Sequence, residues 1–365
     1  MVAGGVFGIA VAARSGPRGP GDGPAQAAAE ATPTDVALPR PETSSPAGPS
    51  PARSDVAATP SQSSTPSTTH TPSPTPAPSP TPTAQPADAP SPTQPADQTA
   101  SSRLQAFMGL STWVDVEDSL EPEQQALIAA DAGVQTIFAQ SSRWRSPRDL
   151  HAAGRLGRLI EAAHDRGVRV VVWYVPDFVD LPRDYLRSQK AMAFVTPRGD
   201  RPDGFGLDIE VEELTDTAER SARLLELSEA LRTWAGPDYP MAAIVLPPLQ
   251  LDLRPSWWPN FPFDQLRASF DVFIPMSYSS FRGTDAGTTY EWNRRNVTEL
   301  RRRAGDPELA VHLAGGIADN LPEVRAFVRA AQQTDVIGAG LYDLETTPTE
   351  AWATLARLRV APPPP

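Results

Sequence analysis

The C-terminal part of the chain alternates short apolar, branched or aromatic runs with longer stretches that carry one apolar side. The short runs predict buried β-strands, and the longer stretches predict amphipathic helices. Strands that alternate with helices form a parallel sheet whose connections are helical crossovers. Eight strands are predicted, over Ala106–Trp113, Val134–Gln140, Val168–Val175, Gly204–Glu210, Met241–Leu246, Asp271–Tyr278, Leu309–Gly315 and Val336–Tyr342.

Cap and turn residues mark helices between these strands. Helices are predicted over Glu121–Ala132, from Ser146-Pro147 to Gly167, over Thr215–Ala235, and from Asn320 and Thr347 onward. Eight strand–helix pairs over residues 104–360 predict an α/β fold, a (β/α)8 TIM barrel. An open doubly wound sheet is the competing architecture. It usually has a Gly-rich turn after its first strand, which Gly109-Leu110-Ser111-Thr112-Trp113 does not provide.

The first hundred residues have a different composition. They hold half of the chain's 42 prolines, and no Phe, Trp or Tyr occurs between Phe7 and Phe107. Such a stretch cannot bury a core, so we expect residues 15–103 to be a disordered Pro/Ser/Thr/Ala-rich linker with polyproline II character. At ~3.1 Å per residue it could extend on the order of 200 Å, enough to cross a cell wall. Residues 361–365 form a Pro-rich tail.

The N-terminal 14 residues include a short apolar run, Val2 to Ala13. A helix of that length is too short for a bilayer, which needs about 20 residues. Its length suits the core of a signal peptide, although no basic residue precedes it. We interpret residues 1–14 as the remnant of a truncated signal or anchor. Together with the linker, this predicts a secreted or cell-surface protein, attached to the envelope through its N-terminus.

Charge and cysteine content exclude several classes of function. The formal net charge of −12 argues against a nucleic-acid partner, which requires a basic face. The chain has no Cys, which excludes disulfides, thiolate nucleophiles and Cys-ligated metal sites. The histidines lack the spacing of a zinc site. We therefore expect a monomer that uses no cofactor and no metal.

The fourth predicted strand carries two acidic residues on one face. Neighbouring side chains of a strand point to opposite faces, so Leu207 and Ile209 can pack outward. Asp208 and Glu210 then point inward together, about 7 Å apart along the strand. At that distance one carboxylate raises the pKa of the other, which keeps an acid protonated near neutral pH. Catalytic groups of TIM barrels lie at this end of the strands.

The segment Asp203-Gly204-Phe205-Gly206-Leu207-Asp208-Ile209-Glu210 resembles the fourth-strand motif DGxDxDxE of the family 18 chitinases. The resemblance implies a barrel that cleaves N-acetylhexosamine polymers. It implies that Glu210 is the general acid and that Asp208 orients the substrate's N-acetyl group, which acts as the nucleophile. Gly206 stands where that family has its middle Asp, so one carboxylate of the motif is absent.

Two further strands carry parts of the same resemblance. Met276-Ser277-Tyr278 is similar to the start of the family's MxYD sequence, and implies that Tyr278 hydrogen-bonds the acetamido oxygen. Ser279 replaces the Asp of that sequence. Tyr342 stands about where the family has a Trp under the sugar, and Asp343 follows it.

Other aromatic side chains near strand ends are candidates for sugar contacts, because amphipathic rings suit sugar faces. The candidates are Trp113, Trp144 and Tyr174, together with Trp257 and Trp258, which we expect to form an exposed pair in a Pro-rich loop. With Tyr342 and Asp343 they make up the predicted substrate-binding set. Acidic residues ring the same mouth, namely Asp115, Glu117, Asp177, Asp343 and Glu345.

Three functions remain open on these residues. The first is a retaining, substrate-assisted glycoside hydrolase with Glu210 as its acid. The second is a muramidase resembling family 25, which also has an Asp-x-Glu on a barrel strand and acts on peptidoglycan. The third is a catalytically inactive barrel that binds envelope glycans, favoured by Gly206 and Ser279. The partner in each case is a polysaccharide.

Overall fold

The computed structural model describes residues 102–283, 285–318 and 320–360. The expected N-terminal remnant, most of the linker and the Pro-rich tail lie outside these residues. The described part contains eight parallel strands: β1 Gly109–Val114, β2 Thr136–Arg143, β3 Arg169–Val175, β4 Gly204–Ile209, β5 Met241–Val245, β6 Val272–Pro275, β7 His312–Gly315 and β8 Gly338–Leu341.

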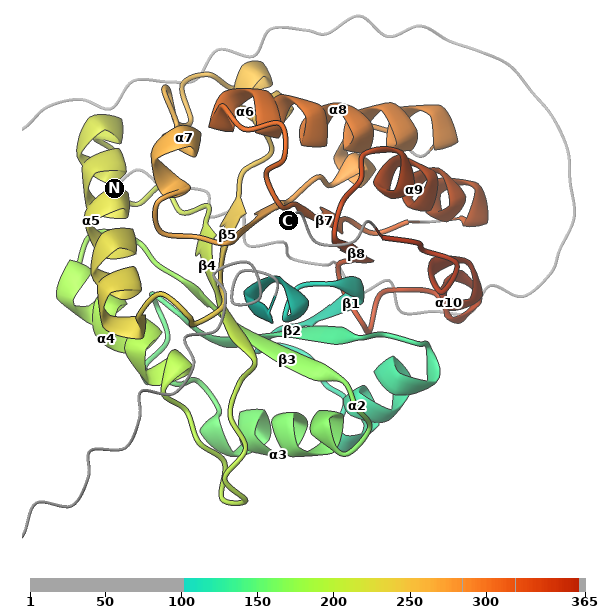
Figure 1. The fold of residues 1–365 in the computed structure, drawn as a ribbon, viewed down its shortest axis with the longest axis horizontal. Helices are drawn as coiled ribbons and strands as arrows, with labels where there is room; N and C mark the ends of the chain where they lie inside the picture. The colour runs from blue at the N-terminus through green and yellow to red at the C-terminus, as the bar shows by residue number, and fades with distance from the viewer. Residues whose placement is uncertain (1–101, 284, 319, 361–365) are drawn as a thin grey trace, which may run out of the picture. The chain divides into compact units, whose positions relative to one another are not determined.

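The strands curl into a barrel. Their order is β6-β5-β4-β3-β2-β1-β8-β7, and two isolated parallel bridges, Phe273 to Val311 and Met276 to Ala314, join the ends of the sheet. Helices surround the strands (Figure 1). The predicted (β/α)8 TIM barrel is therefore confirmed, and the open sheet is excluded by the closing bridges.

The helices cover the outside of the barrel, and their ends follow local sequence. Asp216 caps its helix by accepting hydrogen bonds from the backbone N–H groups of Ala218 and Glu219, and Gly305 ends another in a left-handed conformation. The helices are α2 Pro122–Asp131, α3 Ala153–His164, α4 Leu181–Met192, α5 Thr217–Ala235, α6 Pro248–Leu253, α7 Phe263–Leu266, α8 Ala286–Ala304, α9 Leu321–Gln333 and α10 Thr349–Leu355, with a 3₁₀ turn η1 at Ser279–Phe281.

Aromatic rings fill the inside of the barrel. The ring of Phe138 stacks on that of Trp113 with 4.4 Å between centroids, and His312 meets Phe138 edge-on at 5.0 Å. The His312 ring nitrogens are hydrogen-bonded to the Ser111 hydroxyl and the Phe107 carbonyl oxygen. No cavity is left for a side chain on β8 here, because a Cβ on Gly340 would lie 2.1 Å from the Ser111 carbonyl oxygen. The inside of the barrel around His312 and Phe138 is therefore a packed core.

All eight predicted strands are present, most of them shorter than predicted. β1 begins at Gly109, because the chain before it turns, with the Phe107 N–H donating to the Leu104 carbonyl. The helix predicted from Ser146 begins at Ala153 instead. Residues 146–152 form a loop, whose backbone carbonyl at Ser146 accepts a hydrogen bond from Arg187. Among the described residues no helix is both long and apolar enough to cross a membrane.

Candidate active site

Strand β4 places two carboxyl groups at the mouth of the barrel. Gly206 of β4 faces the inside of the barrel, because a Cβ on it would lie 3.5 Å from the Trp173 Cβ. The Trp173 ring itself lies inside the barrel, with its centroid 5.9 Å from that of the Trp113 ring. Alternation puts Asp208 and Glu210 on this same inner face. Asp208 is 5% exposed, and Glu210, one step nearer the mouth, is partly exposed. The predicted inward pair is present, and solvent reaches its outer member.

The surroundings favour the protonated form of both acids. Burial raises the pKa of Asp208 well above its usual range, and the neighbouring Glu210 raises it further. Burial raises the pKa of Glu210 to about 7, with an opposing effect from the positive charge of Arg145. Within the described ranges the buried Asp208 Oδ1 has no hydrogen-bond partner. A carboxyl oxygen in that position is available to a ligand, because buried polar atoms normally have partners.

Two tyrosines lie beside the pair. Tyr278 follows β6 and Tyr342 follows β8, and their ring centroids are 6.0 Å apart. Burial raises the pKa of Tyr278 well above its usual range, and the nearby Asp208, Glu210 and Asp343 raise it further. The Tyr278 hydroxyl therefore keeps its proton and can donate it in a hydrogen bond. The Tyr342 hydroxyl already donates to Asp115, over 2.7 Å.

The position of the missing motif Asp is filled by apolar packing. A Cβ on Gly206 would lie 2.8 Å from the Ile244 Cδ1 of β5, closer than such atoms approach in proteins. An Asp side chain does not fit there without movement of Ile244. At the position where the family 18 motif has a carboxylate, this barrel has hydrocarbon, which adds to the burial that raises the pKa of Asp208.

The loop between β2 and α3 brings a cation to the site. Trp144 is half-buried, and the guanidinium of the exposed Arg145 lies over its ring, 5.6 Å from the centroid. Arg145 is close enough to Glu210 to lower its pKa. Sequence reasoning selected Trp144 and missed Arg145, although a polar residue in a loop after a barrel strand is where function is expected.

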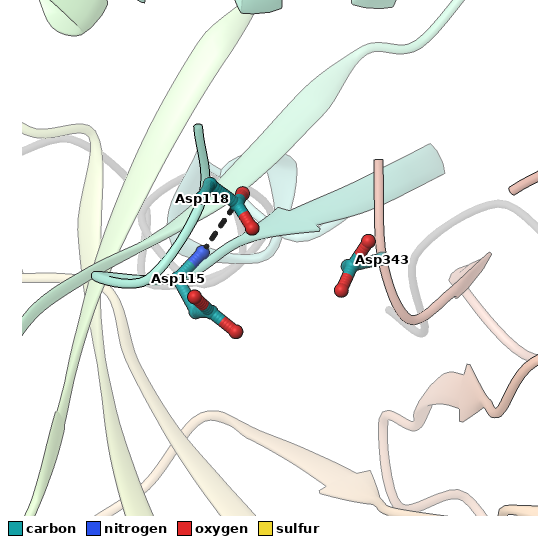
Figure 2. A group of neighbouring side chains, drawn as sticks. All are labelled: Asp115, Asp118 and Asp343. Carbon is teal, nitrogen blue, oxygen red and sulfur yellow. Dashed lines mark hydrogen bonds between the residues drawn. The ribbon is translucent and has the colours of Figure 1, made fainter. Parts of the chain in front are cut away.

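A second group of acids lies across the mouth, after β1 and β8. We call Asp115, Asp118 and Asp343 the acidic cluster. One carboxylate oxygen of each lies within 4.8 Å of the others. Figure 2 shows Asp115 and Asp118 side by side, with Asp343 reaching toward them from the segment after β8. Burial and the charges of Asp115, Asp343 and Glu345 raise the pKa of Asp118 to about 8.

Each carboxylate of the acidic cluster accepts hydrogen bonds from nearby groups. Asp118 Oδ2 accepts from the Asp115 N–H, and Asp343 Oδ1 accepts from the Thr346 N–H. Asp115 accepts from the Glu117 N–H as well as from Tyr342. The spacing would fit a divalent cation with oxygen ligands. Protonation of Asp118 would also relieve the repulsion, because burial and the neighbouring carboxylates raise the pKa of this group. Asp343, predicted to bind substrate, is a buried member of this cluster.

Two predicted sugar-binding residues lie elsewhere. Tyr174 is fully buried, and its hydroxyl donates to Asp184 of α4 over 2.6 Å, because alternation along β3 turns it away from the inward Trp173. Trp258 is 1% exposed and its indole N–H donates to the Ser221 hydroxyl. The expected exposed pair of tryptophans is thus wrong for Trp258. Arg220 covers its ring, with the guanidinium 4.4 Å from the centroid.

The remaining aromatic candidates, Trp113 and Trp257, differ in burial. Trp113 is buried inside the barrel, 6.2 Å from the Tyr342 ring, and its indole nitrogen has no partner among the described residues. Trp257 is half-buried, with the Arg254 guanidinium over its ring. Sequence reasoning missed Phe281, which is 60% exposed and lies 6.4 Å from the Tyr278 ring. Nothing in the sequence distinguishes Phe281 from a core residue, and only the structure shows that its side chain is exposed.

No protein-family model and no curated protein sequence matches the chain. Solved structures do match its fold. The chain superposes on a chitinase from Bacteroides thetaiotaomicron with a TM-score of 0.53 and 14% identity, covering 69% of this chain and 95% of that one. For the spore cortex-lytic enzyme SleL of Bacillus cereus the TM-score is 0.54, at 7% identity, with 71% and 76% covered. For an endo-1,4-β-D-mannanase from Thermotoga petrophila the TM-score is 0.50, at 12% identity, with 65% and 88% covered.

The structural neighbours thus include TIM barrels of glycoside hydrolases, and at these low identities the chain is similar to them in fold. These enzymes differ in activity, so the fold does not select a substrate. The function has to be argued from the site on β4.

Proposed function

We propose that the protein is a glycoside hydrolase that cleaves an N-acetylhexosamine-containing polysaccharide with retention of configuration. The observation that carries the proposal is the pair on β4. Asp208 and Glu210 share the inner face at the mouth of the barrel, with the outer carboxyl open to solvent and the pKa of both raised. A protonated carboxylic acid near neutral pH is what general-acid cleavage of a glycosidic bond needs.

Each side chain has a role that suits its surroundings. Glu210 gives its proton to the glycosidic oxygen as the bond from that oxygen to C1 breaks. The substrate's acetamido oxygen attacks C1 from the other face and forms a cyclic intermediate. Water then attacks C1 from the side of Glu210, the bond from C1 to the acetamido oxygen breaks, and the water gives a proton to Glu210. The acid is thereby restored, and the two successive displacements at C1 retain the configuration.

Asp208 and Tyr278 orient the acetamido group in this scheme. The unpartnered Asp208 Oδ1 accepts the amide N–H, and the protonated Tyr278 hydroxyl donates to the amide oxygen. An amide held at both ends presents its oxygen to C1, which lowers the entropic part of the barrier. Tyr342 supports the sugar with its ring, because its hydroxyl is bonded to Asp115.

Glu210→Gln tests the proposal. The amide has nearly the same shape but no acidic proton, so turnover of N-acetylglucosamine oligomers or peptidoglycan glycan strands should fall by about 10² to 10⁴. Binding of the oligomers should persist. NMR of the first products of the unmutated protein should show the β-anomer. Equal rates for the two proteins, or an inverted product, would contradict the mechanism.

A glycan-binding barrel without catalysis is the second candidate. It is favoured by the packing at Gly206, where Ile244 occupies the place of a carboxylate that the family 18 motif has. This candidate predicts binding of the same oligomers with no product from the unmutated protein. Export to the cell surface belongs to either proposal and rests on residues 1–103 of the sequence. Locating the protein in fractionated cells tests that part.

A further inference from the structure

The loop between β2 and α3 presents a positive charge at the mouth of the barrel, that of Arg145, close enough to Glu210 to lower the pKa of its carboxyl group. The exposed Arg145 takes part in no ion pair among the described residues, and Trp144 supports its guanidinium from below. The nearby Arg143, by contrast, pairs with Glu117. Stacking on an aromatic ring holds a guanidinium in place and leaves its N–H groups available.

A buried arginine holds this loop in shape. Arg187 of α4 is 1% exposed, and its guanidinium donates to the carbonyl oxygens of Arg143 at 2.9 Å, of Trp144, and of Ser146 at 2.5 Å. Its Nε lies 3.6 Å from Asp149. A buried guanidinium bound to three carbonyl groups on both sides of residue 145 fixes the backbone that carries Arg145. The cation at the mouth is therefore preorganised.

More cations lie on the other side of β4. The Arg254 and Arg282 guanidiniums each lie 4.8 Å from a tryptophan centroid, those of Trp257 and Trp292. Burial lowers the pKa of Arg282, and the charge of Arg254 lowers it further, so the two cations are close enough to repel each other. The acidic cluster lies instead at β1 and β8. Positive charges thus lie at the β2, β5 and β6 loops, and that of Arg254 is close enough to Glu212 to oppose the rise that burial causes in the pKa of that carboxyl group.

We propose that Arg145 is a specificity-determining residue that binds a carboxylate of the saccharide next to the bond at Glu210. The substrate is then an acidic N-acetylhexosamine glycan rather than a neutral one. The planar guanidinium suits a carboxylate because it can donate two parallel N–H bonds to the two oxygens. This inference rests on the proposed function, since it takes Glu210 as the point of cleavage.

The test compares matched oligomers with and without their carboxylate. One arm uses N-acetylhexosamine oligomers that carry a lactyl ether, as native acid and after reduction of the carboxyl group to an alcohol. A second arm uses oligomers in which N-acetylhexosamine alternates with a uronic acid, treated in the same way. The quantity measured is the ratio of kcat/KM for the acid over that for its reduced form. Both forms of the oligomer are assayed with the same variant at one pH, so this ratio cancels any effect that the substitution has on the pKa of Glu210.

The unmutated protein should prefer the acid of one arm by about tenfold or more, and Arg145→Gln should remove most of that preference. Arg145→Lys should keep part of it, because the charge remains. Arg148→Gln changes another exposed arginine of the same loop and should leave the preference as it is. The arm that shows the preference identifies the carboxylate as a lactyl or a uronic acid group. An equal ratio in the unmutated protein and Arg145→Gln would overturn the inference.

Binding separates this inference from the proposed function. Calorimetric titration of Glu210→Gln, and of Glu210→Gln with Arg145→Gln, measures the same preference without turnover. If no oligomer is cleaved, the proposed function fails. The carboxylate site still stands if the acid binds about tenfold tighter than its reduced form only when Arg145 is present. Equal binding of both forms in both variants refutes the site.

Discussion

The β4 pair and the acidic cluster are two groups of carboxylates at the same end of one barrel, and they differ in what occupies them. Both contain acids with a raised pKa, Asp208 and Glu210 in one and Asp118 in the other. The cluster's oxygens accept hydrogen bonds from backbone N–H groups and from Tyr342. The buried Asp208 Oδ1 has no partner in the part of the chain that the structure describes.

That difference separates a structural role from a functional one. The acidic cluster stabilises the turns after β1 and β8, because its carboxylates bind amides of those turns. In the β4 pair, Asp208 Oδ1 is buried without such a partner among the described residues, and an unsatisfied buried carboxyl oxygen costs free energy in the absence of a ligand. We infer that a ligand supplies the missing partner. Variants within or beside each group test the two roles separately.

The largest expected difference is in turnover. Asp208→Asn keeps the shape of a neutral carboxyl group, and its Oδ1 can still accept from the acetamido N–H. The amide cannot ionise, however, so it cannot balance the positive charge that the acetamido group gains as its oxygen attacks C1. We expect turnover to fall by about 10². Asp118→Asn, in the acidic cluster, should change turnover by less than about twofold. Steady-state hydrolysis of one oligomer by both variants decides between the groups, and equal losses would remove the distinction.

The pH dependence of activity should follow the β4 pair. With the pKa of Glu210 at about 7, the acid form is lost as pH rises, so kcat/KM should fall about tenfold per pH unit above that value. Asp208, Tyr278 and Arg145 face this carboxyl group. Removing the charge in Arg145→Gln should move the alkaline limb to higher pH, since Arg145 lowers the pKa of Glu210. A limb that stays in place, measured from initial rates, would contradict this assignment.

The strands and the β4 pair could be predicted from sequence because both follow from alternation. Apolar runs identified eight strands, and the parity of Asp208 and Glu210 against Leu207 and Ile209 put the acids inside. The same parity separates Trp173 from Tyr174, so the outward position of Tyr174 was also within reach. The ends of elements are harder to predict than their positions. The start of α3, for example, depends on hydrogen bonds from Arg187 to the preceding loop.

The burial of Trp258 could not be predicted, because its partners come from another element. Its ring lies under Arg220 and its N–H donates to Ser221, both on α5. The loop sequence around Trp258 is polar and Pro-rich, which is typical of an exposed segment. The cation at Arg145 was missed for a related reason: its distance from Glu210 depends on how the β2 and β4 ends meet across the mouth.

The packing under the β4 pair predicts a loss of stability. In Gly206→Ala the new Cβ would lie 2.8 Å from Ile244 Cδ1, so overpacking should cost about 1–3 kcal/mol. Ile244→Val removes that methyl group, so the double variant should lose less than the sum of the two single losses. Urea unfolding of the four proteins measures the coupling. Additive losses would mean that Ile244 does not fill the place of the missing Asp.

The smallest effect concerns the acidic cluster. The folded chain holds the Asp118 proton up to a pKa of about 8, whereas the unfolded chain releases it near pH 4. The folded state binds more protons between these values, so its stability falls as pH rises. Asp118→Asn should flatten that dependence and stabilise the fold by about 1 kcal/mol at pH 8, because solvent reaches the group and reduces the full effect. Thermal unfolding at pH 5 and pH 8 checks this. An unchanged slope would contradict it.

A crystal structure of Glu210→Gln with an N-acetylglucosamine oligomer would show which group of acids binds the sugar. We expect an acetamido nitrogen within hydrogen-bond distance of Asp208 Oδ1 and its oxygen at the Tyr278 hydroxyl. A saccharide bound over Asp115, Asp118 and Asp343, with Asp208 still lacking a partner, would contradict the proposed role of the β4 pair.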